Sequence, residues 1–388
     1  MTVLDIARVR PLADRATTMP RSAIREIMML AAGRSDVFHL EVGEPEFGTP
    51  DWIVDEAFRA VRAGATRYTP NSGTQRLRAA IAGRVGAKFG RGVEPDRVAV
   101  TTGAIGALFS AIFAVVDPGD EVLLPDPGWP NYESIVHLSG ARAVRYAQPA
   151  GQGFLPDPAA MERLIGPRTK AIVISTPGNP TGAVFPRKIM EEIGRLAVRH
   201  GLYLISDEVY EDFVFEGEHV SALEVAPDDR VIVVSGFSKS YAMTGWRLGY
   251  LVCPPTVAAV AGAIQEPVTS CPSAPSQAAA EAALAGDQSV IGRFCDIYRR
   301  RRDILVEVFD DSSALPVVPQ GAFYGFIAIG ASGERSLAFA KRLLQEQSVA
   351  AVPGITFGPQ SDGFIRVAFT VEDSRFREAL RRLRGAIG

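Results

Sequence analysis

Cysteine and histidine are scarce in this chain of 388 residues. The three cysteines, Cys253, Cys271 and Cys295, are odd in number and show no CxxC spacing, which argues against a disulfide framework and against a thiolate metal site. The four histidines are scattered without the spacing of metal ligands, so no metal centre is expected. Free cysteines without partners indicate a reducing compartment.

Long apolar runs and an excess of charge are also missing. The sequence has no run of 18 or more apolar residues, and residues 1–22 lack the apolar core of a signal peptide. With 41 basic and 44 acidic residues, the formal net charge of -3 gives no electrostatic reason to bind nucleic acid or an anionic membrane. We therefore expect a soluble, cytoplasmic protein whose substrates are small molecules.

Strand and helix patterns alternate through the middle of the chain. Short β-branched segments at 170–176, 202–206 and 230–235 are interleaved with stretches of helical spacing such as 187–200. This alternation is typical of βα units that form a mostly parallel, doubly wound sheet. The predicted fold class is therefore α/β, and the length allows two domains.

The pattern changes near residue 285. A long charged helix is predicted over 289–309, and strands over 322–329 and 364–369 then indicate a smaller α+β unit. We expect residues 49–285 to form the large domain and residues 286–388 the small one. Residues 1–48 are expected to pack on the small domain, which is then built from both ends of the chain.

Small and polar residues gather where the predicted strands end, which is where doubly wound sheets bind ligands. Gly103 and Ala104 open a helix whose free N–H groups suit a phosphate, although a simple helix cap is the alternative. Asn179 stands in a segment that also reads as a turn. Asp207 directly follows an apolar run, with Tyr210 three residues later, and a carboxylate at that depth needs a cation, a hydrogen bond or a proton.

A single lysine, Lys239, follows another predicted strand. An unpaired buried ammonium is costly unless its pKa falls or the amine is used covalently. Ser238 and Arg247 are close to it in the sequence, and a hydroxyl, a guanidinium and a helix N-terminus together make a phosphate-binding set. A phosphate, a buried carboxylate and a lone lysine share one economical explanation, a pyridoxal 5′-phosphate site.

The segment GFSKSYAMTGWRLG around Lys239 strongly resembles the lysine-attachment signature of fold-type I, class I/II pyridoxal-phosphate aminotransferases. Other segments stand in that family's order and cover nearly the whole chain, namely PRSAIREI, GEPEFGTP, RYTPNSGTQRLRAAI, VTTGAIGAL, DPGWPNY, GNPTG, SDEVYEDF, PQGAFYGF, VPGITFG and FIRVAF. The resemblance implies an enzyme that moves an amino group between an amino acid and a 2-oxo acid by a ping-pong mechanism.

The resemblance also implies roles at the cofactor ring. Lys239 corresponds to the lysine that holds the cofactor as a Schiff base, and Asp207 to the partner of the pyridine nitrogen. Asn179 and Tyr210 correspond to the donors to the phenolic oxygen of the ring. Trp129 corresponds to the aromatic side chain that stacks on the ring face. Lys239, Asp207 and Tyr210 form the expected catalytic set.

Phosphate and substrate contacts follow from the same resemblance. Tyr68 corresponds to a tyrosine that reaches the phosphate from a neighbouring subunit, which implies a homodimer with shared active sites. Arg366 corresponds to the arginine that pairs with the substrate carboxylate, with Gly43 and Asn179 beside it. The remaining residues expected around the cofactor phosphate are Gly103, Ala104, Ile105, Ser238 and Arg247.

The chain departs from its aspartate-using bacterial relatives at Ile105, where they carry a lysine for the side-chain carboxylate of the substrate. An unpaired carboxylate there would be costly, so we expect a neutral, apolar or aromatic amino-acid donor. An acidic acceptor such as 2-oxoglutarate would need another cation, for which Arg21 and Arg25 are candidates. Gly236 stands where several relatives have serine, so Ser238 is expected to do more of the phosphate binding.

Two other classes of function compete with the aminotransferase interpretation. A lyase or decarboxylase on the same fold stays open, because these reactions begin from the same bound state of cofactor and substrate. A regulator that uses such a domain as a sensor would need a fused DNA-binding module, for which the segment before Gly43 leaves no room and offers no basic recognition helix.

Overall fold

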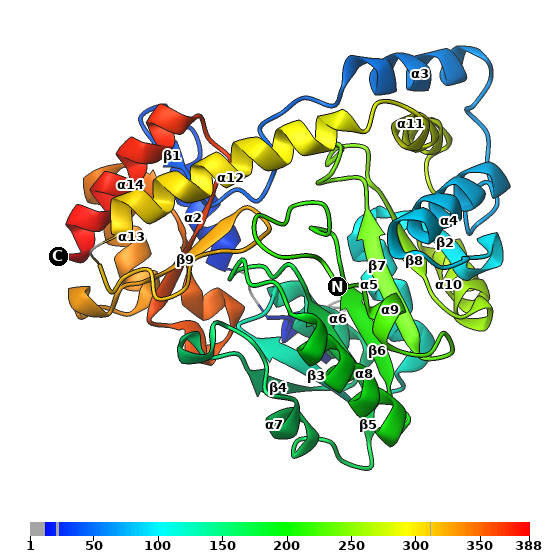
Figure 1. Ribbon diagram of the computed structural model, residues 1–388, viewed down its shortest axis with the longest axis horizontal. Helices are drawn as coiled ribbons and strands as arrows, with labels where there is room; N and C mark the ends of the chain where they lie inside the picture. The colour runs from blue at the N-terminus through cyan, green and yellow to red at the C-terminus, as the bar shows by residue number, and fades with distance from the viewer. Residues whose placement is uncertain (1–11, 21–22, 311) are drawn as a thin grey trace, which may run out of the picture.

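The computed structural model describes residues 12–20, 23–310 and 312–388, and a seven-stranded sheet forms its larger part (Figure 1). The strands lie in the order β2-β8-β7-β6-β5-β3-β4. All neighbours pair in parallel except β8, which is antiparallel to both β2 and β7. The predicted α/β class with a mostly parallel sheet is therefore confirmed. The strands are β2 (Val98–Thr102), β3 (Glu121–Asp126), β4 (Arg142–Ala147), β5 (Thr169–Ser175), β6 (Tyr203–Asp207), β7 (Val231–Gly236) and β8 (Leu248–Val252).

Helices cover both faces of this sheet. Val231 and Val233 of β7 belong to the core on one face, while Ile232 and Val234 belong to the core on the other. Both sets are apolar because both faces are buried, so the strand reads as a continuous apolar run. One face is covered by α5 (Gly103–Val115), α6 (Pro130–Ser139) and α10 (Pro255–Thr269). The other carries α4 (Gln75–Phe89), α8 (Arg187–His200), α9 (Ala222–Val225) and α11 (Ala274–Ala285). Helix α3 (Asp51–Arg62) packs on α11, and α7 (Pro158–Glu162) packs on α8.

A smaller part contains strands from both ends of the chain. Strands β9 (Tyr324–Ala328), β12 (Phe364–Ala368) and β11 (Val352–Pro353) form an antiparallel sheet, and β1 (Phe38–His39) pairs in parallel with β10 (Val349–Ala350). This pairing supports the proposal that the N-terminal segment belongs with the small domain, whose bounds stay a prediction. Its helices are α2 (Ala23–Ala31), α12 (Ser289–Phe309), α13 (Ser336–Gln347) and α14 (Asp373–Ile387).

Short helical elements complete the described chain. They are α1 (Asp14–Thr17) and the 3₁₀ turns η1 (Pro95–Arg97), η2 (Ala150–Gln152), η3 (Gly330–Ser332), η4 (Gly354–Phe357) and η5 (Pro359–Ser361). Among the residues that the structure describes, no helix combines the length and the apolar character needed to cross a bilayer.

The long helix α12 runs from the region of α11 toward α13 and α14 (Figure 1). Its buried Arg301 donates to Asp373 at the start of α14 over 2.9 Å and to the carbonyl oxygen of Phe369 over 2.8 Å. The same guanidinium pairs with Glu46 in the N-terminal segment. A buried arginine is stable only when such partners satisfy it, so this set fixes three distant segments relative to one another.

The start of α5 lies against β8 because Gly249 has no side chain. A Cβ atom at Gly249 would lie 2.3 Å from the backbone nitrogen of Ala104 and 2.5 Å from the carbonyl carbon of Gly103. Neither of these backbone atoms can move without shifting the first turn of α5. The close approach therefore sets where that helix N-terminus lies.

We expect Gly249→Ala to lower the free energy of unfolding by about 1–3 kcal/mol, because it overpacks this contact. Gly245→Ala is the matched control, since a Cβ atom there meets nothing within 4 Å. Urea unfolding of both variants measures the difference. Equal stability of the two proteins would contradict the role given to Gly249.

Candidate active site

A cavity of about 470 Å³ lies at the edge of the large sheet where β5, β6 and β7 end. It is lined by all of the predicted site residues except Gly103 and Tyr68. The structure thus brings together segments from residue 43 to residue 366 of the chain. The predicted residues in its wall are Gly43, Ala104, Ile105, Trp129, Asn179, Asp207, Tyr210, Ser238, Lys239, Arg247 and Arg366.

Asp207 is the last residue of β6 and is 4% exposed. The hydroxyl of Tyr132 donates to its Oδ2 over 2.6 Å, and the backbone N–H of Val209 approaches Oδ1 at 3.4 Å. Burial raises the pKa of Asp207 to about 6, although the Tyr132 hydrogen bond opposes the shift. The charge of Lys239 also favours the ionised form, but Asp207 has no ion-pair partner among the described residues, which suits the carboxylate to meet a positive group in the cavity.

Lys239 lies three residues beyond the end of β7, half-buried in the cavity wall. Its Nζ donates to the carbonyl oxygen of Gly43 over 2.6 Å. Burial lowers the pKa of Lys239 to about 8, and the charges of Arg366 and Arg247 act in the same direction while Glu44 opposes them. A substantial fraction of the amine is then neutral near pH 8, which is the nucleophilic form of a lysine.

The N-terminus of α5 fits an anion. Gly103 has a φ of +71°, and a Cβ atom there would lie 2.6 Å from a guanidinium nitrogen of Arg247. The residue before the helix, Thr102, makes no side-chain cap hydrogen bond, so the simple cap does not explain this turn. Gly103 itself does not line the cavity, whereas Ala104 and Ser238 do. Free N–H groups beside a guanidinium and a hydroxyl form a phosphate-binding set.

Arg366, in the middle of β12, is 3% exposed and borders the cavity. It donates to Asn179 Oδ1 over 3.1 Å and to the carbonyl oxygen of Glu41 over 2.7 Å, and its guanidinium carbon lies 4.4 Å from the ring centre of Tyr324. Its Nε is buried and has no hydrogen-bond partner among the described residues. A buried guanidinium with an unused donor fits a planar carboxylate.

Sequence reasoning missed Tyr132 and Tyr324. Tyr132 lies on α6 three residues after Trp129, which it contacts edge-on, and it is the donor to Asp207. Tyr324 shares a hydrogen bond of 2.8 Å with Tyr210. Both stand inside segments that resemble the family, DPGWPNY and PQGAFYGF, yet nothing in their spacing shows which residue they contact.

Tyr68 and the two N-terminal arginines lie elsewhere. Tyr68 is 89% exposed and does not line the cavity, so its predicted contact with a neighbouring subunit stays a prediction. Arg25 is exposed on α2 and does not line the cavity either. Arg21 lies outside the described residues.

Comparison with known proteins agrees with this geometry. Residues 35–383 match the family Aminotransferase class I and II. An aspartate aminotransferase of Thermotoga maritima is 39% identical over 349 residues, covering 90% of each chain. An aspartate/prephenate aminotransferase of Thermus thermophilus is 38% identical over 356 residues, covering 91% of each. The solved structure of an aspartate aminotransferase from Thermus thermophilus with maleate matches with a TM-score of 0.92 and 37% identity over 97% of this chain and 100% of that one.

The chain therefore belongs to the class I and II aminotransferase family. It is a pyridoxal-phosphate-dependent aminotransferase, and the lyase or decarboxylase alternative is not favoured. The donor set of the cavity fits the cofactor: an amine of lowered pKa, a buried carboxylate with no ion-pair partner in the described part of the chain, and a helix N-terminus without a side-chain cap beside a guanidinium. When bound, the cofactor supplies an electron sink for the substrate.

The buried Asp207 gives a pH-dependent prediction for the cofactor-free protein. Its pKa rises from 3.8 to about 6 on folding, so the stability it contributes is present below about pH 4 and is lost as the pH rises through about 6. Asp207→Asn removes the ionisable group, so the variant does not lose this stability as the pH rises. The stability difference, variant minus wild type, should rise by on the order of 3 kcal/mol between about pH 4 and about pH 8.

Denaturant unfolding at both pH values measures this difference. Asp303→Asn, which removes an exposed carboxylate on α12, is the control and should show no such rise. A stability difference for Asp207→Asn that does not change with pH would show that this carboxyl group ionises freely in the folded protein.

Proposed function

We propose that Lys239 holds the cofactor and that its Nζ then moves the proton of the substrate Cα. The support is the position of this amine in the cavity wall, where burial lowers its pKa to about 8. Asp207 pairs with the cofactor's ring nitrogen and keeps it protonated. Asn179 and Tyr210 donate to the phenolic oxygen, and Trp129 covers the ring face.

Two cationic anchors hold the ends of the bound molecules in this proposal. Arg247, Ser238 and the first N–H groups of α5 hold the phosphate, which fits the contact between Gly103 and Arg247. Arg366 holds the substrate carboxylate through the side of its guanidinium that includes the unpartnered Nε. These anchors orient the Cα–H bond toward Lys239, which lowers the barrier by proximity.

We infer that the amino-acid donor is neutral and apolar or aromatic, and that a 2-oxo acid accepts the amino group. The observation that carries this is the charge in the cavity wall. Among the described residues, its only lysine and arginine side chains are Lys239, Arg247 and Arg366, and each has another role. No fourth cation is left there for the side-chain carboxylate of an acidic substrate.

Apolar side chains occupy part of that wall. Ile24 and Met28 contribute from α2 and Ile105 from the first turn of α5, and Trp129 lies in the same wall. A methyl-rich surface favours an apolar side chain by burying its area. The relatives named for aspartate indicate the competing donor, which the experiment must therefore include.

Half-reactions with single amino acids test the substrate. The conversion of the bound cofactor to its amine form is followed by absorbance for leucine, phenylalanine, tyrosine, aspartate and glutamate. A neutral apolar or aromatic amino acid should react with the highest kcat/KM. Ile105→Lys should raise kcat/KM for aspartate by about tenfold or more, because it supplies the missing cation, and Ile105→Met should not. Fastest conversion by aspartate in the wild type would refute the proposal.

We propose further that the enzyme is a cytoplasmic homodimer with active sites shared across the interface. Support comes from Tyr68, a tyrosine that is 89% exposed in this protomer although the resemblance places it at a phosphate. A partner protomer that covers it would bury an apolar ring and satisfy its hydroxyl. The absence of disulfide spacing among the three cysteines supports the reducing location.

Mixing two inactive variants tests the shared site. In a hybrid of Lys239→Ala and Tyr68→Ala protomers, one of the two sites regains both wild-type residues. Random reassociation should therefore restore up to about a quarter of the wild-type activity at limiting cofactor. A mixture of Lys239→Ala with Asp207→Ala is the control, because both residues act within one protomer and neither site is repaired. No recovery in the first mixture would contradict the shared site.

A further inference from the structure

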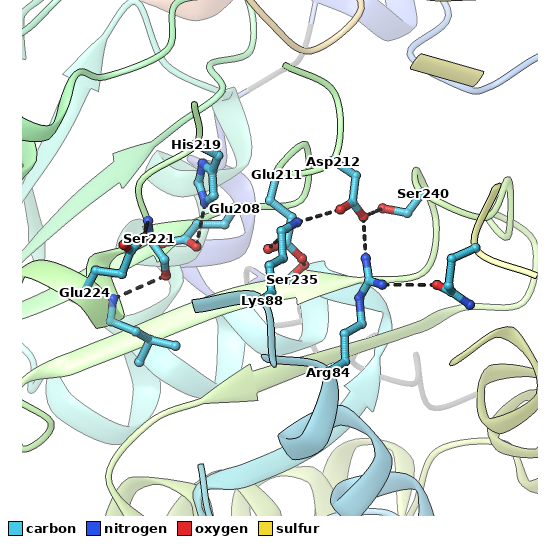
Figure 2. Close-up of polar contacts among 12 residues, drawn as sticks. Arg84, Lys88, Glu208, Glu211, Asp212, His219, Ser221, Glu224, Ser235 and Ser240 are labelled. Carbon is cyan, nitrogen blue, oxygen red and sulfur yellow. Dashed lines mark hydrogen bonds and ion pairs between the residues drawn. The ribbon is translucent and has the colours of Figure 1, made fainter. Parts of the chain in front are cut away.

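A cluster of charged and hydroxyl side chains includes Ser240, the residue that directly follows Lys239 in the sequence (Figure 2). Its cations come from one face of α4, its acids follow the Asp207–Tyr210 segment, and its serines flank Lys239 in the sequence. We call it the acid–serine cluster, and its members are Arg84, Lys88, Glu211, Asp212, Ser235 and Ser240.

Asp212 is the centre of this cluster. Its Oδ2 accepts from the hydroxyl of Ser240 over 2.6 Å and from Arg84 over 2.8 Å, and its Oδ1 accepts from Lys88 over 2.6 Å. The Asp212 side chain is 10% exposed. Burial by itself raises its pKa, but the charges of Lys88 and Arg84 outweigh this and hold the pKa below its ordinary value. Asp212 is therefore an ionised acceptor with a fixed set of donors.

Glu211 makes a second, weaker link beside the first. It accepts from the hydroxyl of Ser235 over 3.3 Å and lies 3.2 Å from the amine of Lys88. Ser235 is in β7, four residues before Lys239, while Ser240 directly follows that lysine. The two acids and the two cations of the cluster balance in charge. Their mutual attraction offsets the cost of burying charged groups, although most of the cluster is shielded from water.

The neighbouring acids need no metal to explain them. Glu208, Glu211 and His219 bring ligand atoms within 4.8 Å of one another. Glu208 already accepts from Ser206 and from the backbone N–H of Ala222, and it pairs with His219 at 3.0 Å. Figure 2 shows this group on the far side of Glu211 from Asp212. The two carboxylates are satisfied by protein donors, while Nδ1 of His219 has no hydrogen-bond partner among the described residues.

The backbone around Lys239 is weakly held by its own hydrogen bonds. Between β7 and β8 the chain forms turns, and the N···O distances of their backbone hydrogen bonds lie at or just above the upper end of the usual range. The N–H of Tyr241, Ala242 and Met243 reach their acceptors at 3.2, 3.3 and 3.2 Å. Ala242 also has a φ of +52°, which a residue with a Cβ atom adopts at a cost. Side-chain anchors must therefore fix this segment.

We propose that Ser240 and Asp212 are positioning residues for Lys239. The Ser240–Asp212 hydrogen bond joins the segment of the lysine to the segment of Asp207 and Tyr210, and α4 holds the shared carboxylate from behind. The bond sets where the amine of Lys239 stands relative to the cavity. This inference rests on the proposed role of Lys239 as the cofactor lysine.

Ser240→Ala tests the bond without changing any charge. A lysine segment that is held less firmly lets water reach the lysine nitrogen, and better solvation favours its charged form. The pH midpoint of the bound cofactor's absorbance should therefore shift upward by about half a unit or more. The kcat should fall about tenfold while KM changes less than about twofold, because positioning acts on the reacting geometry rather than on binding.

A double-mutant cycle and a buried control complete the design. Ser240→Ala/Asp212→Asn should lower kcat no more than the larger of the two single changes, because both remove the same bond. Glu121→Gln removes a buried carboxylate that binds Arg142 and Arg168 at the start of β3, the other end of that strand from the cavity. This control should lower the unfolding midpoint but leave kcat and the absorbance midpoint unchanged.

Two outcomes would overturn the inference. One is an unchanged absorbance midpoint and kcat in Ser240→Ala; the other is losses in the single variants that simply add. Borohydride reduction of the wild-type holoenzyme, followed by peptide mapping, separates this failure from that of the proposed function. If the reduced cofactor is found on the peptide that contains Lys239, only the positioning role of Ser240 and Asp212 is refuted. If it is found on another lysine, the assignment of Lys239 as the cofactor lysine is refuted.

Discussion

The removal of water from one lysine and one aspartate is the constraint on which the rest of the site depends. Burial lowers the pKa of Lys239 and raises that of Asp207, so it moves both groups toward their neutral forms. Each needs protein partners at a fixed place: the carbonyl oxygen of Gly43 for the amine and the hydroxyl of Tyr132 for the carboxyl. The loops and helices around them supply these partners. When the cofactor binds, water therefore does not compete with it for hydrogen bonds to these two groups.

The sheet explains how such distant residues converge. β5, β6 and β7 run in the same direction, so their carboxyl ends deliver polar side chains to one edge while their interiors stay apolar on both faces. The smaller part then closes the cavity with Arg366 from β12, and that residue bonds to Asn179 of the larger part. The two parts therefore share the site that neither completes alone.

The long periodic elements could be predicted from the sequence, since the helices over 187–200 and 289–309 match α8 and α12, and the strands shift by a residue or two. The cavity residues followed from strand ends and from motif resemblance. The antiparallel direction of β8 did not follow, because alternating patterns do not encode direction. Tyr132 and the Ser240–Asp212 bond were missed because contacts between side chains far apart in sequence leave no periodic signal.

In the proposed function, helix α2 separates substrate choice from the machinery around the cofactor. One side of it, with Ile27 and Ala31, packs into the core of the smaller part, while Ile24 and Met28 project into the cavity wall. Substitutions at the latter two positions change the shape of the cavity wall at places that belong to neither Lys239, nor Asp207, nor the first turn of α5. Such a layout lets new specificities evolve through a few tolerated changes, and it makes these two positions natural targets for a mutagenesis library.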